Sequence, residues 1–189
     1  KKDFTTAITK AEGVKTAMGD KTKPKVYKLL ADAYFQKGDF ANAKNNMENY
    51  FSKEKPEEVI ANDYKLLADI ISKTGGTNDE IVNAYLKGVE LDTVLTSKID
   101  FLKQGAAYFK TNKIRDKEGD LIQKIISLKP KPSINDYFDL TLARYFTPDN
   151  AKSRVVALTM IEKFPDQPYG YEWAFNNSNV MDSVKKDSI

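Results

Sequence analysis

Apolar side chains recur along this chain at the spacing of an amphipathic helix, in several separate stretches. Tyr27, Leu30, Ala31 and Tyr34 lie at positions i, i+3, i+4 and i+7, which fall on one face of a helix. A second stretch with the same period runs from position 40 to about position 51. The pattern therefore predicts two consecutive helices, each with one apolar face.

Short breaks in the apolar pattern separate and end these two helices. Gly38 and Asp39 lie between them, and glycine readily adopts the positive φ that a helix C-cap requires. Pro56 follows the second stretch and cannot continue a helix. The segment is therefore predicted to be a helical hairpin. One such hairpin cannot bury its apolar face alone, so neighbouring hairpins must stack on it.

The same arrangement returns every 37 residues. Small residues share this phase at Ala31, Ala68 and Gly105, where a second helix can approach closely. The segments 27–35 and 64–72 are identical over their first six residues. Two series of mostly aromatic positions have the same spacing: Tyr27, Tyr64, Phe101 and Phe138, and then Tyr34, Ile71, Tyr108 and Tyr145.

These positions resemble the tetratricopeptide repeat family, whose signature is W-x2-L-G-x2-Y, then A-x3-F, then P. The period of 37 is slightly longer than the family's usual period of about 34. The resemblance implies an all-α fold, a right-handed α-solenoid of helical hairpins. The matching residues are Tyr27-x2-Leu30-Ala31-x2-Tyr34, then Ala43-x3-Met47, then Pro56.

The repeat predicts a single array over residues 1–189. Leu142 occupies the position of the small residue in the fourth unit, which makes that unit degenerate. Both ends are expected to cut through a repeat, so the chain is predicted to be a fragment of a longer protein. The predicted segments are 1–20 (second helix of a preceding repeat), 24–56, 61–92 and 98–130 (repeats), 133–165 (degenerate repeat) and 168–189 (start of a further repeat).

Composition argues against most catalytic and metal-binding classes. The chain contains no Cys and no His, which removes thiolate nucleophiles, Ser-His-Asp triads and the commonest transition-metal ligands. We therefore expect no enzyme activity, no metal and no cofactor. The best enzymatic alternative pairs Asp32 with Asp69, which occupy equivalent positions in neighbouring units. Against it, each has a lysine one turn away that favours the ionised form, whereas a general acid must hold its proton.

Charge and hydropathy restrict the partners further. The net charge is +3, from 30 basic and 27 acidic residues that are interspersed along the chain. A nucleic-acid-binding protein more often has a dense basic face, so no nucleic-acid partner is expected. No apolar run reaches the length of a membrane span, so no transmembrane segment is predicted.

The resemblance also implies a binding groove, because first helices of tetratricopeptide hairpins line the concave surface. Phe35 and Phe109 are expected either to face this groove or to pack between hairpins. Lys28/Asp32 and Lys65/Asp69 are i,i+4 pairs, either surface ion pairs or a charge ladder that orients a peptide. The predicted groove residues are Lys25, Lys28, Asp32, Phe35, Gln36, Asn62, Lys65, Asp69, Ser72, Lys73, Leu102, Ala106, Phe109 and Lys110.

The function that the resemblance implies is the binding of a protein or peptide partner. One group in the family, the chaperone-binding co-chaperones, grips a peptide's terminal carboxylate with Lys and Asn. Here Asp32 and Asp69 are expected to cancel the adjacent lysines, so a mixed-charge or largely apolar segment is predicted instead.

Two other functions remain open. Residues 164–171 and the Lys/Asn-rich surface resemble long tetratricopeptide proteins of the Gram-negative cell envelope. This resemblance implies a periplasmic or envelope location, with the cytoplasm as the alternative. It also implies that the abundant aromatic residues could stack on carbohydrate or another nutrient. The remaining function is structural, with the repeats as spacers or as elements of dimerisation through the terminal repeats.

Overall fold

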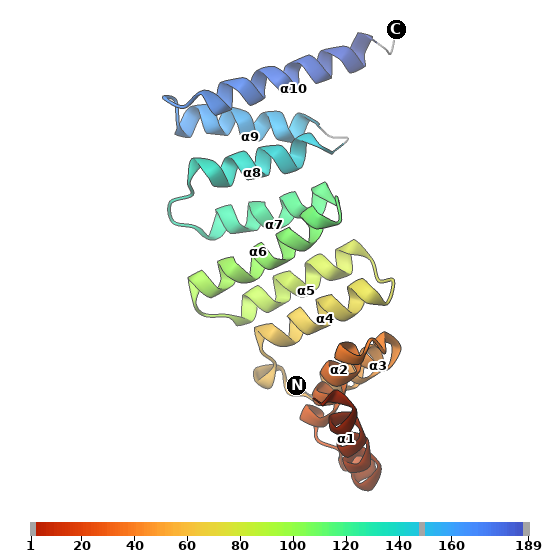
Figure 1. The fold of residues 1–189 in the computed structure, drawn as a ribbon. Helices are drawn as coiled ribbons and strands as arrows, with labels where there is room; N and C mark the ends of the chain where they lie inside the picture. The colour runs from red at the N-terminus through yellow and green to blue at the C-terminus, as the bar shows by residue number, and fades with distance from the viewer. Residues whose placement is uncertain (1–2, 148–149, 187–189) are drawn as a thin grey trace. The chain divides into compact units, whose positions relative to one another are not determined.

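The structure, a computed structural model, describes residues 3–147 and 150–186. This part of the chain forms ten α-helices that pack as sequential hairpins, as predicted (Figure 1). It divides into two compact units, Lys1–Thr93 (unit 1) and Val94–Ile189 (unit 2). Within the described residues, no helix has both the length and the apolar character needed to cross a membrane.

Unit 1 contains five α-helices and two short 3₁₀ turns. Within it, α2 packs against α3 and α4 packs against α5, and α1 packs against α2. The 3₁₀ turns, Gly19–Lys21 and Pro56–Glu58, precede α2 and α4. The α-helices are α1 (Phe4–Met18), α2 (Pro24–Lys37), α3 (Phe40–Lys53), α4 (Ala61–Lys73) and α5 (Asn78–Leu91).

The turn of the first hairpin forms where the sequence predicts it. Gly38 has φ = 81°, in the left-handed region that glycine enters without strain, and its N–H donates to the carbonyl of Phe35. The next residue, Asp39, caps α3 by accepting a hydrogen bond of 3.2 Å from the N–H of Asn42. Helix α2 therefore ends and α3 begins within two residues.

The core of unit 1 depends on the small residues of the repeat. Ala31 on α2 and Ala43 on α3 are fully buried, as is Ala68 on α4. Their small side chains let the helices approach, and the aromatic ring of Tyr27 and the side chain of Met47 fill the space around the first two.

The described residues of unit 2 also form five helices, and adjacent helices again run side by side (Figure 1). Close contacts occur where a glycine faces a neighbouring helix: the guanidinium of Arg144 on α8 covers Gly119 on α7. That guanidinium also forms a 2.8 Å ion pair with Asp120. The helices are α6 (Leu95–Thr111), α7 (Arg115–Leu128), α8 (Ile134–Tyr145), α9 (Asn150–Lys163) and α10 (Pro168–Lys186).

The fourth repeat is displaced by one residue from the predicted phase. Leu142 is only half-buried, and Thr141 is fully buried at the contact with α9. The Thr141 hydroxyl lies 3.5 Å from Met160 Sδ, and its carbonyl accepts a hydrogen bond from Ser153. The assignment of Leu142 to the small position was therefore wrong. The buried positions 137, 140, 141 and 143 reproduce the buried positions 27, 30, 31 and 33 of α2.

The displaced aromatic residues of α8 have a different role. Phe138 and Tyr145 lie on the side of α8 that contacts α10, with ring centroids 6.0 and 5.0 Å from that of Trp173. These edge-on contacts are of the kind that stabilise aromatic pairs. Within unit 2, the aromatic pattern therefore joins one hairpin to the helix that follows it.

We expect Ala68→Leu to destabilise the protein by about 1–3 kcal/mol, because three added carbon atoms have no space at a fully packed helix contact. The matched control is Ala41→Leu, which makes the same change at an exposed position on α3. Equilibrium urea unfolding measures both. Equal midpoints for the two variants would contradict the packing described here.

Candidate functional site

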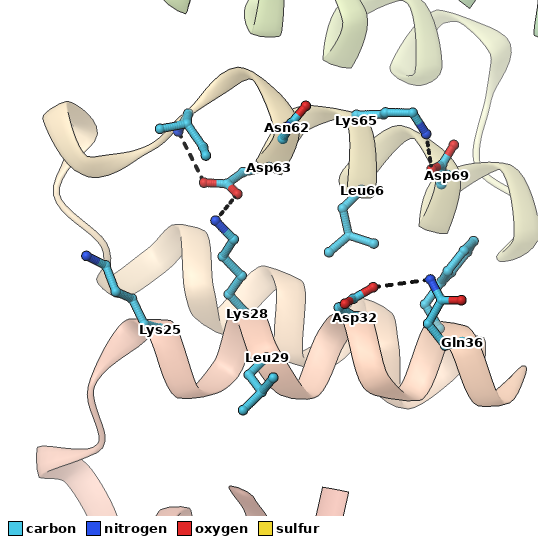
Figure 2. A pocket seen from close by; sticks show the side chains of 12 residues that line it. Lys25, Lys28, Leu29, Asp32, Gln36, Asn62, Asp63, Lys65, Leu66 and Asp69 are labelled. Carbon is cyan, nitrogen blue, oxygen red and sulfur yellow. Dashed lines mark hydrogen bonds and ion pairs between the residues drawn. The ribbon is translucent and has the colours of Figure 1, made fainter. Parts of the chain in front are cut away.

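A cavity of unit 1 lies between α2 and α4. Its volume is about 660 Å³, and it is partly open to solvent. We call it the α2–α4 groove (Figure 2). Its lining residues are Lys25, Lys28, Leu29, Asp32, Phe35 and Gln36 from α2, and Ile60, Asn62, Asp63, Lys65, Leu66 and Asp69 from α4 and the residue before it.

The sequence predicted most of this lining from the first two units. Eight of the predicted groove residues line the cavity: Lys25, Lys28, Asp32, Phe35, Gln36, Asn62, Lys65 and Asp69. The spacing accounts for their position at the cavity, because residues that lie between the packing positions of a helix face away from its own hairpin.

The assignments taken from the third unit were mostly wrong. Leu102 and Phe109 are fully buried, and Ala106 is also buried, so these side chains form the core of unit 2. Phe109 therefore does not face a solvent-accessible groove. Lys110 lines a separate, smaller cavity of about 190 Å³ in unit 2. Lys73 lies in another depression, beside α3 in unit 1.

Four lining residues were missed. Leu29 and Leu66 have the 37-residue spacing of the repeat and lie between packing positions, so the same analysis could have found them. Their apolar character is more typical of residues in the core. Nothing in the repeat pattern marks Ile60 or Asp63, because Asp63 contacts α2 and α3 only in the folded chain and Ile60 donates its N–H to Asp63.

Asp63 is a fully buried carboxylate that joins three helices. Oδ2 accepts a hydrogen bond of 2.6 Å from the hydroxyl of Tyr50 on α3 and one of 3.1 Å from the N–H of Ile60. Oδ1 forms an ion pair with the ammonium of Lys28 on α2, drawn in Figure 2. A buried charge is strongly unfavourable without such partners. We call these residues, Lys28, Tyr50, Ile60 and Asp63, the Asp63 cluster.

The Asp63 cluster also changes the acidity of the tyrosine. Burial of the phenol, followed by its hydrogen bond to Asp63 and the negative charge of that carboxylate, raises the pKa of Tyr50 well above its usual range. The ammonium of Lys28 lies 5.6 Å from the centroid of the same ring, within the range of a cation–π interaction. Lys28 is therefore held by two neighbours at the wall of the groove.

The two i,i+4 pairs differ, although the sequence around them is identical. On α4, Lys65 forms the predicted ion pair with Asp69, at 2.8 Å. On α2, Lys28 is engaged with Asp63, and Asp32 instead accepts a 3.3 Å hydrogen bond from the side-chain amide of Gln36. The prediction that Asp32 cancels Lys28 was therefore wrong.

The apolar part of the groove is accessible. Leu29 and Ile60 are 49% and 52% exposed, which is high for aliphatic side chains. Leu66 is half-buried and points from α4 toward Asp32 in Figure 2. Phe35 is half-buried against the ring of Phe40, at 5.5 Å between centroids. The groove thus combines aliphatic surface with charged groups whose positions are fixed by their partners.

The acidic side chains of the groove have neighbouring hydrogen-bond or ion-pair partners. Over the described residues, no group of three or more acidic, His or Cys side chains is placed to hold a metal ion. The carboxylates that could act in acid–base chemistry are engaged: Asp63 in its cluster, Asp69 with Lys65, and Asp32 with Gln36.

Comparison with known proteins agrees with this architecture. The chain is similar in structure to the C-terminal part of a TPR repeat-containing protein from Cytophaga hutchinsonii, with a TM-score of 0.58 and 21% sequence identity. The similarity covers 97% of this chain and 68% of that one. No protein-family model and no curated protein matches the sequence. The structural likeness shows a tetratricopeptide-like fold.

We expect Tyr50→Phe to lower the free energy of unfolding near neutral pH, by about 1–3 kcal/mol, because the buried carboxylate loses a hydrogen bond. The pKa of Tyr50 is higher in the folded than in the unfolded state. The unfolded state therefore loses this proton first as the pH rises above about 10, and the stabilisation decreases there. The difference between parent and variant should accordingly shrink at alkaline pH.

Urea unfolding at pH 8 and pH 11 measures this difference. Tyr27→Phe, at another buried tyrosine of unit 1, is the matched control. A Tyr50→Phe effect that is the same at both pH values would contradict the assigned role of the phenol.

Proposed function

We propose that this chain is a non-catalytic binding scaffold, and that the α2–α4 groove holds a short segment of a protein partner. The observation that carries this proposal is the cavity of about 660 Å³, which is lined by both exposed aliphatic and charged side chains. Its volume falls within the usual range for ligand sites, roughly 300–1,000 Å³. Its open side suits a chain that passes through, as a peptide does.

The exposed leucine and isoleucine support this proposal. Leu29 and Ile60 lie on opposite sides of the groove, one on α2 and one just before α4. Burying them under a ligand would remove about half of each side chain from water, a gain of roughly 25 cal/mol per Å². Exposed apolar side chains at a concave site commonly belong to an interaction surface.

The Asp63 cluster supports the proposal in a second way. It fixes Lys28 and the start of α4 relative to α2 and α3, so both walls of the groove are held by buried contacts. A preformed groove loses little conformational entropy when a ligand binds. When a flexible segment binds there, less of the interaction free energy is therefore lost to ordering the groove.

We expect Leu29→Asp to abolish peptide binding in this groove, because a charge then occupies the apolar wall. A phage-displayed library of random dodecapeptides identifies binders, and fluorescence polarisation gives their Kd. Leu158→Asp, at an exposed leucine of α9, is the matched control and should leave binding unchanged. If no peptide is selected, or selected peptides bind the Leu29→Asp variant equally well, the proposal is wrong.

A second candidate function, carbohydrate binding, is favoured by the first turns of α10. Tyr169, Tyr171 and Phe175 are all more than two-fifths exposed there. Tyr171 and Phe175 are one helical turn apart, so their rings share a face of the helix. Exposed aromatic rings with one polar end are suited to binding amphipathic ligands.

A glycan array, followed by titration of any binder, tests this second function. We expect the double change Tyr171→Ala and Phe175→Ala to lower the affinity for a bound glycan at least tenfold, while Leu29→Asp leaves it unchanged. Absence of any glycan signal above that of the double variant would refute carbohydrate binding at α10.

A further inference from the structure

Three lysines and three aspartates line the α2–α4 groove, but their ion pairs are unevenly distributed. Each lysine has an acidic partner: Lys65 with Asp69 at 2.8 Å, Lys28 with Asp63, and Lys25 with Glu58 at 3.3 Å. Asp32 has only the neutral amide of Gln36, and over the described residues no cation lies within ion-pair distance of its carboxylate. The groove thus contains one exposed carboxylate that lacks a counter-charge.

The position of this carboxylate is informative. Asp32 lies near the middle of the α2 wall, one turn from Leu29 and facing Leu66 of α4 (Figure 2). Apolar side chains close to a charge lower the local dielectric and strengthen its attraction for an opposite charge. A ligand cation at Asp32 would therefore lie directly beside surface that accepts an aliphatic side chain.

We propose that the α2–α4 groove selects a peptide segment in which a basic residue is flanked by aliphatic residues, with the cation at Asp32. This inference rests on the proposed function and specifies the class of partner. The carboxylate of Asp32 receives a Lys or Arg side chain of the ligand, and Gln36 orients the carboxylate. Leu29, Ile60 and Leu66 contact the flanking aliphatic side chains.

The spacing of these groups suits an extended ligand. Side chains three residues apart on a helix have Cβ atoms about 5–6 Å apart, which applies to Leu29 and Asp32. In an extended peptide, side chains on one face recur every second residue, at roughly 6.6–6.8 Å. An aliphatic residue and a basic residue separated by one position can therefore contact Leu29 and Asp32 together.

An acidic ligand is disfavoured for the converse reason. To bind it, Lys28 would have to leave Asp63, and the buried carboxylate would lose its counter-charge. Lys65 would likewise have to leave Asp69. Lys28 and Lys65 are therefore committed within the fold, whereas Lys25 has an exposed side chain and pairs with Glu58 at the surface.

The test uses three blocked, fluorescein-labelled peptides with the core Leu-Ser-X-Ser-Leu, where X is Arg, Gln or Glu. The symmetrical core presents the same side chains in either direction of binding. Fluorescence polarisation gives Kd values for the parent, for Asp32→Asn, for Asp32→Lys, and for the control Asp166→Asn. Asp166 is an exposed aspartate of unit 2, so its change matches the loss of charge.

We expect the Arg peptide to bind the parent about tenfold more tightly than the Gln peptide, as for a charge-assisted hydrogen bond. Asp32→Asn should remove this preference, whereas Asp166→Asn should keep it. Asp32→Lys should reverse the preference, so that the Glu peptide binds more tightly than the Arg peptide. Circular dichroism verifies that each variant remains folded.

Other results separate the two proposals. If all three peptides bind the parent equally, and Leu29→Asp abolishes binding, the groove binds peptides but the basic specificity is overturned. The same conclusion follows if the Arg preference survives in Asp32→Asn. If none of the peptides binds at millimolar concentration, this inference is overturned, and the selection from the random library then decides the proposed function by itself.

Discussion

A buried carboxylate is the constraint on which unit 1 depends. Asp63 is withdrawn from water completely, and a charge in that position is strongly unfavourable without partners. Its three partners come from α2, from α3 and from the start of α4, so one side chain fixes how the second hairpin docks on the first. The small side chains of Ala31 and Ala68 let neighbouring helices approach closely. They do not by themselves fix the orientation of those helices.

The same constraint determines the charge of the groove. Lys28 and Lys65 are equivalent in the repeat, and each is followed by an aspartate one turn later. Lys65 pairs with that aspartate, whereas Lys28 pairs with Asp63, so Asp32 has no ion-pair partner among the residues that the structure describes. One buried group thus converts two identical sequence segments into two different surfaces. A repeat protein can acquire specificity in this way without losing the regular spacing of its helices.

Unit 2 achieves close packing by other means. Arg144 lies over Gly119 and is held by Asp120, and Trp173 contacts two aromatic rings of α8. Bulky aromatic side chains occupy the positions of α8 that contact α10. The third and fourth repeats do not carry the residues that line the groove in the first two. A binding surface in this unit would therefore have a different chemistry, which the exposed rings of α10 illustrate.

The sequence by itself determined the helices, their pairing into hairpins and most of the groove lining, because these follow from local periodicity and from turn residues such as Gly38. Tertiary structure decided what periodicity does not encode. Leu102 and Phe109 occupy groove positions in the repeat but are buried, since the neighbouring helices decide which face is covered. The shift to Thr141 on α8 came from packing against α9. The Asp63 cluster joins residues 13 and 35 positions apart, and only the folded chain brings them together.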